Sequence, residues 1–335
     1  MRVFDGHNDV LARLAEAGDD APAGFLAGDG EGMIDVPRAA RGGLRGGCFA
    51  VFTCSPPEEA YESAAYFAPV DPAKALEEAL AQVAILLRLE RSSGGRVRVV
   101  RSTEDLEGPG IGAVLHLEGA EPIGPGLEAL DVLHAAGMRS LGLTWSRANA
   151  FATGVPFGFP GSPDQGPGLT AAGRALVRAC GELGVLVDVS HLNARGFWDV
   201  VDAGAGPLVA SHSGAHALCP SPRNLTDDQL RVIGERRGLV GINFHVGFLR
   251  ADGELDADTP LATLAAHAAH VAEVAGVGCV GLGSDFDGAV MPADLADVTR
   301  LPAALDALRA AGFGEDEIEG IAWRNWHRVL AATWG

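Results

Sequence analysis

The sequence predicts an α/β fold in which eight parallel strands and their connecting helices close into a (β/α)8 TIM barrel. Apolar strand-like runs and amphipathic helical patterns alternate along the whole chain. Several of the apolar runs end in ionisable residues, as strands do at the catalytic rim of a barrel. The length of 335 residues suits one barrel, which commonly uses about 250 residues or more. We therefore expect a single catalytic domain over residues 1–335.

The predicted elements follow from the spacing of apolar residues in chain order. Buried-strand patterns lie near residues 3–9, 48–53, 111–118, 139–145, 185–190, 207–212, 238–244 and 279–285. Helical patterns lie at residues 72–91, 126–136, 170–183, 194–203, 226–235, 260–275, 301–311 and 315–332. Three of the helices begin with N-cap or first-turn residues, at Asp71-Pro72, Thr170 and Thr226-Asp227-Asp228.

Two segments have no clear period. The stretch from Gly154 to Gly168 is rich in Gly and Pro, which predicts a loop over the rim of the barrel. Residues 18–47 are expected to be irregular. An open, doubly wound sheet is the alternative fold, but Gly281-Leu282-Gly283 lacks the third spaced glycine of a phosphate loop, and acidic residues follow it.

Ionisable residues stand at the ends of five predicted strands. The first strand ends in Asp5-Gly6-His7-Asn8-Asp9, where residues two apart point to the same side. The other four strands lead to Glu118, His191, His212 and Asp285. Because the parallel strands of a barrel all deliver their C-terminal residues to one rim, we expect these side chains to converge.

Imidazole and carboxylate groups in this pattern indicate a metal site. Taken singly, each fits an ordinary hydrogen-bonded residue, but five donors in this order favour metal binding. Five ligands are too many for a single tetrahedral catalytic ion. We therefore expect two Zn²⁺ ions per chain, bridged by Glu118. His7 and Asp9 would complete one site, and His191 and His212 the other. Asp287 competes with Asp285 as an acid near the ions, and the role of His245 stays open.

Composition narrows the class of protein. The net charge of −19 and the absence of a Lys/Arg cluster exclude a nucleic-acid partner. Five scattered cysteines in apolar sequence indicate buried thiols and a reducing compartment. With no secretion signal and no apolar run of about 18 residues, we expect a cytoplasmic protein with no membrane contact.

Six motifs in this order resemble the membrane (renal) dipeptidase family, zinc-dependent enzymes of the amidohydrolase superfamily. They are Asp5-Gly6-His7-Asn8-Asp9, Leu117-Glu118-Gly119, Val187-Asp188-Val189-Ser190-His191, Ala210-Ser211-His212-Ser213, Pro222-Arg223-Asn224-Leu225-Thr226-Asp227 and Gly283-Ser284-Asp285-Phe286-Asp287-Gly288. The resemblance runs through essentially the whole chain. It implies a distorted (β/α)8 barrel, two zinc ions and hydrolysis of dipeptides, including those with a C-terminal D-residue. Bacterial members similar to this chain are commonly homodimers, so the resemblance also implies a homodimer.

Carried over by position, the resemblance implies the metal ligands named above. It makes Asp285 the residue that takes a proton from the water between the ions and passes it to the leaving amine. It makes Arg223 the residue that binds the free carboxylate of the substrate, which a guanidinium can do with two parallel hydrogen bonds.

One position departs from the family. Better-known members have histidine after Leu-Thr, where this chain has Leu143-Thr144-Trp145. Trp145 cannot carry a charge, although its ring N–H can donate one hydrogen bond to substrate. Arg147 and Asn149 follow closely and are candidates to replace the missing donor.

Two alternatives stay open at this stage. The first is another binuclear amidohydrolase that acts on a lactone, a cyclic amide or an N-acyl amino acid. The second is a non-catalytic metal-binding or partner-binding barrel, in which Asp285 would have no proton to move.

Overall fold

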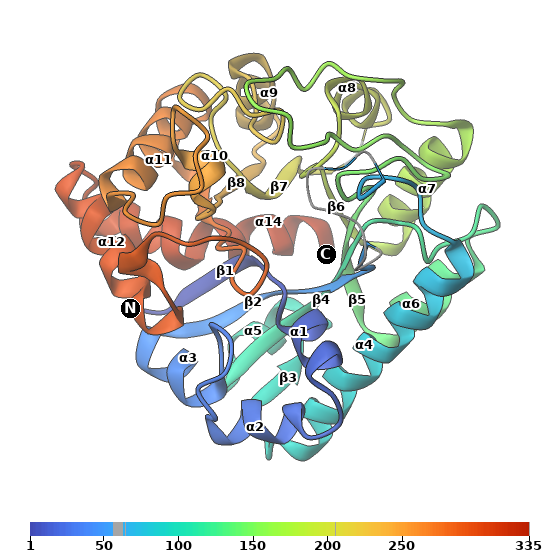
Figure 1. The fold of residues 1–335 in the computed structure, drawn as a ribbon, viewed down its shortest axis with the longest axis horizontal. Coiled ribbons are helices and arrows are strands. Elements are labelled where there is room, and N and C mark those ends of the chain that lie inside the picture. Colours follow the sequence, from blue (N-terminus) through green and yellow to red (C-terminus); the bar gives the residue numbers. More distant parts are fainter. Residues whose placement is uncertain (56–62, 64, 205, 335) are drawn as a thin grey trace.

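The computed structural model describes residues 1–55, 63, 65–204 and 206–334, and eight parallel strands form a closed barrel (Figure 1). This confirms the predicted fold class. In order around the barrel the strands are β1 (Val3–Asn8), β2 (Leu44–Phe52), β4 (Ile111–Glu118), β5 (Met138–Gly142), β6 (Leu186–Asp188), β7 (Val209–Ser213), β8 (Leu239–Ile242) and β9 (Val280–Leu282). Pairing of β9 with β1 closes the ring. All eight carboxyl ends therefore lie at the same rim.

Most helices surround the barrel, as Figure 1 shows, whereas α14 lies across one end of it. Their bounds are α1 (Val10–Ala17), α2 (Ala21–Ala27), α3 (Val36–Gly42), α4 (Pro72–Ser92), α5 (Thr103–Leu106), α6 (Glu128–Ala136), α7 (Ala171–Leu183), α8 (Ala194–Asp202), α9 (Asp227–Glu235), α10 (Val246–Leu249), α11 (Leu261–Ala275), α12 (Leu301–Ala310), α13 (Glu315–Glu319) and α14 (Asn325–Trp334). The predicted caps are formed: the side chains of Asp71, Thr170 and Thr226 each accept a hydrogen bond from a backbone N–H in the first turn.

The prediction that residues 18–47 are irregular was wrong in part: residues 28–35 form neither helix nor strand, but most of the others do. They form α2, α3 and the start of β2. Each of these helices has only seven residues, too few to show an amphipathic period. The start of α3 is set by Asp35, which is buried and accepts hydrogen bonds from the backbone N–H of Arg38 at 2.7 Å and from its Nε at 2.6 Å.

The sequence also did not predict the short strand β3 (Val97–Val99), which pairs with β4 at residues 111–113. Three residues are too few to establish an alternating pattern. The predicted strands at 139–145 and 279–285 extend past β5 and β9, because their last residues leave the sheet to form the rim.

A helical segment covers the end of the barrel at which the strands begin. Residues Gly320–Arg324 form a π-helical turn that continues into α14. Buried Trp326 packs against Phe4 and donates from Nε1 to the carbonyl of Leu282 at 3.0 Å. A Cβ on Gly6 would lie 2.4 Å from the Trp326 ring, so this position of β1 has no room for a side chain. The opposite rim is left for polar residues.

Candidate metal and active site

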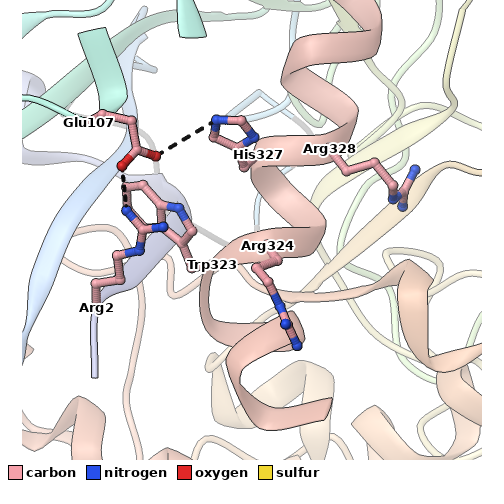
Figure 2. Close-up of a pocket in the computed structure, with 6 residues that line it drawn as sticks. All are labelled: Arg2, Glu107, Trp323, Arg324, His327 and Arg328. Carbon is pink, nitrogen blue, oxygen red and sulfur yellow. Dashed lines mark hydrogen bonds and ion pairs between the residues drawn. The ribbon is translucent and has the colours of Figure 1, made fainter. Parts of the chain in front are cut away.

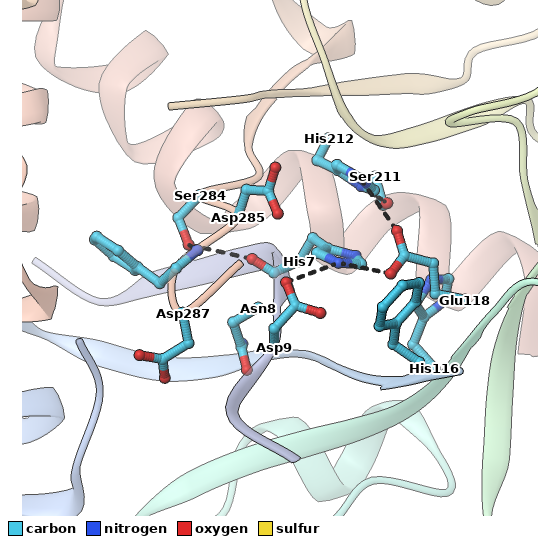
Figure 3. Close-up of polar contacts among 12 residues, drawn as sticks. His7, Asn8, Asp9, His116, Glu118, Ser211, His212, Ser284, Asp285 and Asp287 are labelled. Atoms are coloured by element: carbon cyan, nitrogen blue, oxygen red, sulfur yellow. Dashed lines mark hydrogen bonds and ion pairs between the residues drawn. The ribbon is translucent and has the colours of Figure 1, made fainter. Parts of the chain in front are cut away.

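The predicted metal donors come from four strands and meet at the rim. His7 is near the end of β1, and Asp9 follows that strand as the residue before α1. Glu118 is the last residue of β4, His191 lies just after β6, and His212 is in β7. Their donor atoms form two groups that share Glu118, and the donor atoms within each group lie within 4.8 Å of one another. Figure 3 shows His7, Asp9, Glu118 and His212 directed toward one another.

The first group is His7, Asp9 and Glu118. The Nε2 atom of His7 lies 3.6 Å from Asp9 Oδ2 and 3.6 Å from Glu118 Oε2. His7 is fully buried, and among the residues that the structure describes neither of its ring nitrogens has a hydrogen-bond partner. A buried imidazole without partners is costly unless something else satisfies it. A cation held between His7 Nε2 and the two carboxylates would satisfy that ring nitrogen.

The second group is Glu118, His191 and His212. Glu118 Oε1 lies 3.0 Å from His191 Nε2 and 3.5 Å from His212 Nε2, while these two nitrogens are 2.9 Å apart. Each ring is oriented through its other nitrogen by a serine hydroxyl, Ser146 on His191 at 2.7 Å and Ser211 on His212 at 2.8 Å. Both Nε2 atoms are therefore directed at the shared carboxylate.

The titration behaviour of these groups suits metal binding. Burial, together with the positive charge of Arg223, lowers the pKa of both His191 and His212 well below the usual value, so both rings are neutral ligands at pH 7. Burial raises the pKa of Glu118 to about 8. For His7, burial lowers the pKa, but the charges of Glu118 and Asp9 outweigh it and raise the pKa to about 10. Without a metal, protons would have to compensate these crowded carboxylates, so the donor set fits divalent cations.

Asp285 lies beside this group, just past β9. It forms a third cluster with His7 and His212, whose donor atoms also lie within 4.8 Å of one another. Its backbone adopts a positive φ of 65°, and its Oδ2 accepts a hydrogen bond from Asn243 Nδ2 at 2.9 Å. A positive φ in a residue other than glycine is uncommon and is found where the surrounding structure requires it.

Asp287 does not compete for the same role. Its carboxylate accepts from Arg13 Nε at 3.0 Å and from the backbone N–H of Met33 at 2.5 Å. It also points away from the metal donors in Figure 3. Asp287 therefore ties the segment after β9 to α1 and to the residues before α3.

Arg223 lies in the segment between β7 and α9 and is 3% exposed. Its Nη2 donates to the carbonyl of His212 at 3.1 Å, and its guanidinium lies 5.3 Å from the ring centroid of Phe248. This places a buried cation directly beside the second group of donors. His245, whose role the sequence left open, packs its ring against Phe248 at 4.5 Å, and its backbone N–H donates to Asn243 Oδ1.

Trp145 belongs to an aromatic wall next to His191. Its ring centroid lies 5.3 Å from that of Phe52, 5.7 Å from Phe67, 5.5 Å from Phe157 and 5.9 Å from His191. The position that the resemblance assigns to a cationic donor is thus part of an apolar surface beside the metal donors.

Arg147 and Asn149 do not replace the missing donor. Arg147 donates from Nε to Glu121 at 3.0 Å, from Nη1 to Ser55 Oγ at 3.0 Å and from Nη2 to the carbonyl of Thr53. Asn149 donates to the carbonyl of Leu143 at 2.8 Å. Both expectations were wrong because contacts within the rim loops occupy these side chains.

The Gly- and Pro-rich stretch lies over the rim, as expected. The backbone N–H of Val155 donates to the carbonyl of His191 at 2.8 Å, and that of Gly161 donates to the carbonyl of Pro220 at 2.8 Å. His216 Nε2 also lies 2.8 Å from the carbonyl of Gly161.

Four side chains that support the site were not among the predicted site residues: Ser146, Asp188, Ser211 and Asn243. Asp188 accepts from the backbone N–H and the Oγ of Ser211, at 2.8 and 2.5 Å, and so supports the hydroxyl that orients His212. Asn243 follows β8 and contacts Asp285. Their positions near strand ends could have marked them as site residues. However, Ser and Asn are common in turns because their side chains form hydrogen bonds with nearby backbone.

A surface cavity of about 290 Å³ lies at the other end of the barrel (Figure 2). Its charged side chains are already paired. Arg2 contacts Glu107 at 2.7 Å, Arg324 contacts Asp316 at 2.7 Å, and Arg328 donates to the carbonyl of Gly278 at 2.8 Å. The Arg2 contact joins the start of the chain to the residue after α5, the Arg324 contact joins the π-helical turn to α13, and the Arg328 contact joins α14 to the segment before β9.

Within the described part of the chain, no helix has both the length and the apolar character needed to cross a membrane.

Comparison with known proteins agrees with this geometry. A family model described as membrane dipeptidase (peptidase family M19) matches residues 1–334. A protein of Klebsiella pneumoniae, described only as uncharacterised and encoded in the region 5′ of pqqA, is 47% identical over 257 residues, covering 76% of this chain and 95% of that protein.

Solved structures are also similar to this chain over its full length. A metallopeptidase from Rhodobacter sphaeroides, bound to a phosphinate mimic of the dipeptide L-Ala-D-Ala, is 44% identical with a TM-score of 0.95, over 100% of this chain and 99% of that one. Dipeptidase AC, of peptidase family M19, is also 44% identical, with a TM-score of 0.92 over 100% and 99% of the two chains.

Proposed function

Because the chain belongs to the membrane dipeptidase family (peptidase family M19), we propose that it is a binuclear zinc dipeptidase in which Glu118 bridges the two ions. The observation that carries this proposal is the convergence of five donor residues into two groups that share one carboxylate. His7 and Asp9 would hold one ion, and His191 and His212 the other. When bound, such a metal pair supplies Lewis acidity, which activates water and stabilises charge on the carbonyl oxygen.

The other polar residues account for the rest of the reaction. As a water oxygen bonds to the carbonyl carbon and the C–N bond breaks, Asp285 accepts the proton that the water loses and delivers it to the leaving nitrogen. The products are a free carboxylate and a free amine, and Asp285 returns to its ionised form. Its position beside His7 and His212 supports this role.

Arg223 is proposed to bind the C-terminal carboxylate of the substrate. Its guanidinium is buried beside the second donor group, and a buried cation gains most from an anionic ligand. This contact would select substrates with a free carboxylate one residue beyond the scissile bond, as dipeptides have.

The substrate class includes dipeptides with a C-terminal D-residue. The relative from Rhodobacter sphaeroides binds a mimic of L-Ala-D-Ala, and its fold superposes on the whole of this chain. Trp145 would contact the substrate through the aromatic wall beside His191 and make this part of the site apolar. We further propose one catalytic domain over residues 1–335, which acts as a homodimer in the cytoplasm.

The test is hydrolysis of a library of L-Xaa-L-Xaa and L-Xaa-D-Xaa dipeptides, with metal analysis of the same sample. We expect turnover that a chelator abolishes and that Zn²⁺ restores, with two ions per chain. Turnover of lactones, cyclic amides or N-acyl amino acids in place of dipeptides would assign a different amidohydrolase activity. Metal binding without turnover of any of these would indicate a non-catalytic barrel.

A second arm of the experiment tests Arg223. Each dipeptide is compared with its C-terminal amide, and we expect the free acid to be cleaved at least about 100-fold faster in kcat/KM, because a charged hydrogen-bonded pair is lost in the amide. Arg223→Met should remove most of this difference. Equal rates on acid and amide in the unmodified enzyme would refute the assignment.

A further inference from the structure

The carboxylate of Asp285 is held from one side by a buried amide. Asn243, the residue after β8, is 1% exposed, and its Nδ2 donates to Asp285 Oδ2 at 2.9 Å. Its Oδ1 accepts from the backbone N–H of His245 at 2.6 Å. Because an N–H can only donate, this second contact assigns oxygen to that side of the amide and therefore directs the NH2 group at Asp285.

The backbone on both sides of this contact is fixed as well. The N–H of Asn243 donates to the carbonyl of Ser213 at 2.9 Å. The N–H of Asp285 donates to the carbonyl of His7 at 3.0 Å, and its carbonyl accepts from Gly288 at 3.1 Å. With the backbone held, the Asp285 carboxylate can still move by side-chain rotation, and the hydrogen bond from Asn243 restricts that rotation.

The other oxygen of Asp285, Oδ1, lies near Gly288 and Asp9. A Cβ added to Gly288 would lie 2.1 Å from Asp9 Oδ2 and 3.0 Å from Asp285 Oδ1, so both oxygens border the same small space. Among the described residues, none donates a hydrogen bond to Asp285 Oδ1. One oxygen is thus occupied by Asn243, while the other is left on the side of Asp9.

We propose that Asn243 is a positioning residue for proton transfer: by holding Oδ2 of Asp285, it keeps Oδ1 directed at the reacting water and the leaving nitrogen. This inference rests on the proposed dipeptidase function. The proton that Oδ1 takes from the water is the one it gives to the nitrogen, so no other proton donor is needed. A carboxylate free to rotate would transfer that proton less efficiently to an atom at a set place.

The proposal predicts a dependence on the leaving group. An amide nitrogen leaves only after it has been protonated, whereas an ester oxygen can leave with much less help. In a depsipeptide, an ester oxygen replaces the scissile N–H of the same dipeptide. Departure of this leaving group therefore depends less on the orientation of Asp285. A residue that only stabilises the fold would affect both substrates equally.

The experiment compares Asn243→Ala with the unmodified enzyme on L-Ala-L-Ala and on its depsipeptide, with bound metal and Tm measured on each preparation. We expect kcat on the dipeptide to fall by about 10–100-fold, the range for residues that orient a reacting group. The KM and the metal content should stay nearly unchanged, and the loss on the depsipeptide should be about fivefold or less. If Asn243→Ala does not fold, Asn243→Ser serves the same test, because its side chain is polar but shorter.

Asn325→Ala is the matched control. Its amide makes two hydrogen bonds, to the carbonyls of Val277 at 3.0 Å and Val280 at 2.8 Å, before and at the start of β9. Its loss should lower Tm but leave kcat on both substrates unchanged. Equal losses on dipeptide and depsipeptide in the Asn243 variant, loss of metal, or an effect on KM alone would each overturn the inference. An unmodified enzyme that cleaves no dipeptide would instead overturn the proposed function, and the inference with it.

Discussion

The ion pair between Arg147 and Glu121 allows a quantitative prediction. The side chains are 0% and 2% exposed, and Arg147 Nε lies 3.0 Å from Glu121 Oε1. The guanidinium also reaches Ser55 and the carbonyl of Thr53, so it joins the loops that follow β2, β4 and β5. Arg147→Met removes the cation and leaves a buried carboxylate without a partner.

Removal of one member of a buried ion pair typically costs about 3–5 kcal/mol, because the other charge stays buried and uncompensated. With an unfolding entropy of about 2.1 cal/mol/K per residue, 335 residues correspond to roughly 0.7 kcal/mol/K. We therefore expect Tm to fall by roughly 4–7 °C in Arg147→Met. Adding Glu121→Gln removes the stranded charge, so the double variant should recover about 2 kcal/mol.

The assay is urea unfolding and calorimetry of both single variants and the double variant. Arg195→Met serves as a control, since its ion pair with Asp164 is 65% and 60% exposed and should change Tm by no more than about 1 °C. Additive losses in the double variant, or a loss in Arg147→Met no larger than that of the control, would refute this account. Arg147 also lies 4.9 Å from the Trp145 ring centroid, so its loss should loosen the aromatic wall.

Three further predictions follow from the site and the core. Glu118→Gln should reduce binding of both ions, measured as metal per chain after dialysis; full retention of two ions would contradict a bridging role. Asp285→Asn should keep its metal and lose about 10²–10⁴-fold in kcat, whereas activity within a few-fold of the unmodified enzyme would exclude it as the proton carrier. Burial lowers the pKa of His267 from 6.5 to about 4, so its unfolded form binds protons more readily and stability should decline as pH falls from 6.5 to 4, by about 3 kcal/mol in total. His267→Gln should flatten this decline in urea unfolding measured at pH 7.5 and 5. An unchanged pH dependence in that variant would contradict the expected effect of burial on His267.

Local patterns in the sequence were sufficient for most of the barrel. The strand predicted at 111–118 coincides with β4, because a mostly apolar run between glycine and proline signals depends only on neighbouring residues. The same reasoning located the rim, since parallel strands bring their carboxyl ends together whatever their lengths. The candidate ligands could thus be named without knowing any distance.

The supporting contacts could not be predicted this way. Arg147 and Asn149 looked like substitutes for a missing donor because they are close to Trp145 in sequence, yet Arg147 pairs with Glu121 and Ser55 on other loops. Asp287 looked equivalent to Asp285, but Arg13, 274 residues away in the chain, holds it.

The sequence by itself therefore determined the barrel, its rim and the kind of residues gathered there, since strand period and strand direction are local properties. Only the tertiary structure decided which carboxylate faces the donors and which is paired elsewhere, and that Asn243 holds Asp285 across 42 residues. The physical reason is that hydrogen bonds and ion pairs between rim loops depend on how separate segments pack, and neither apolar spacing nor turn composition carries that information.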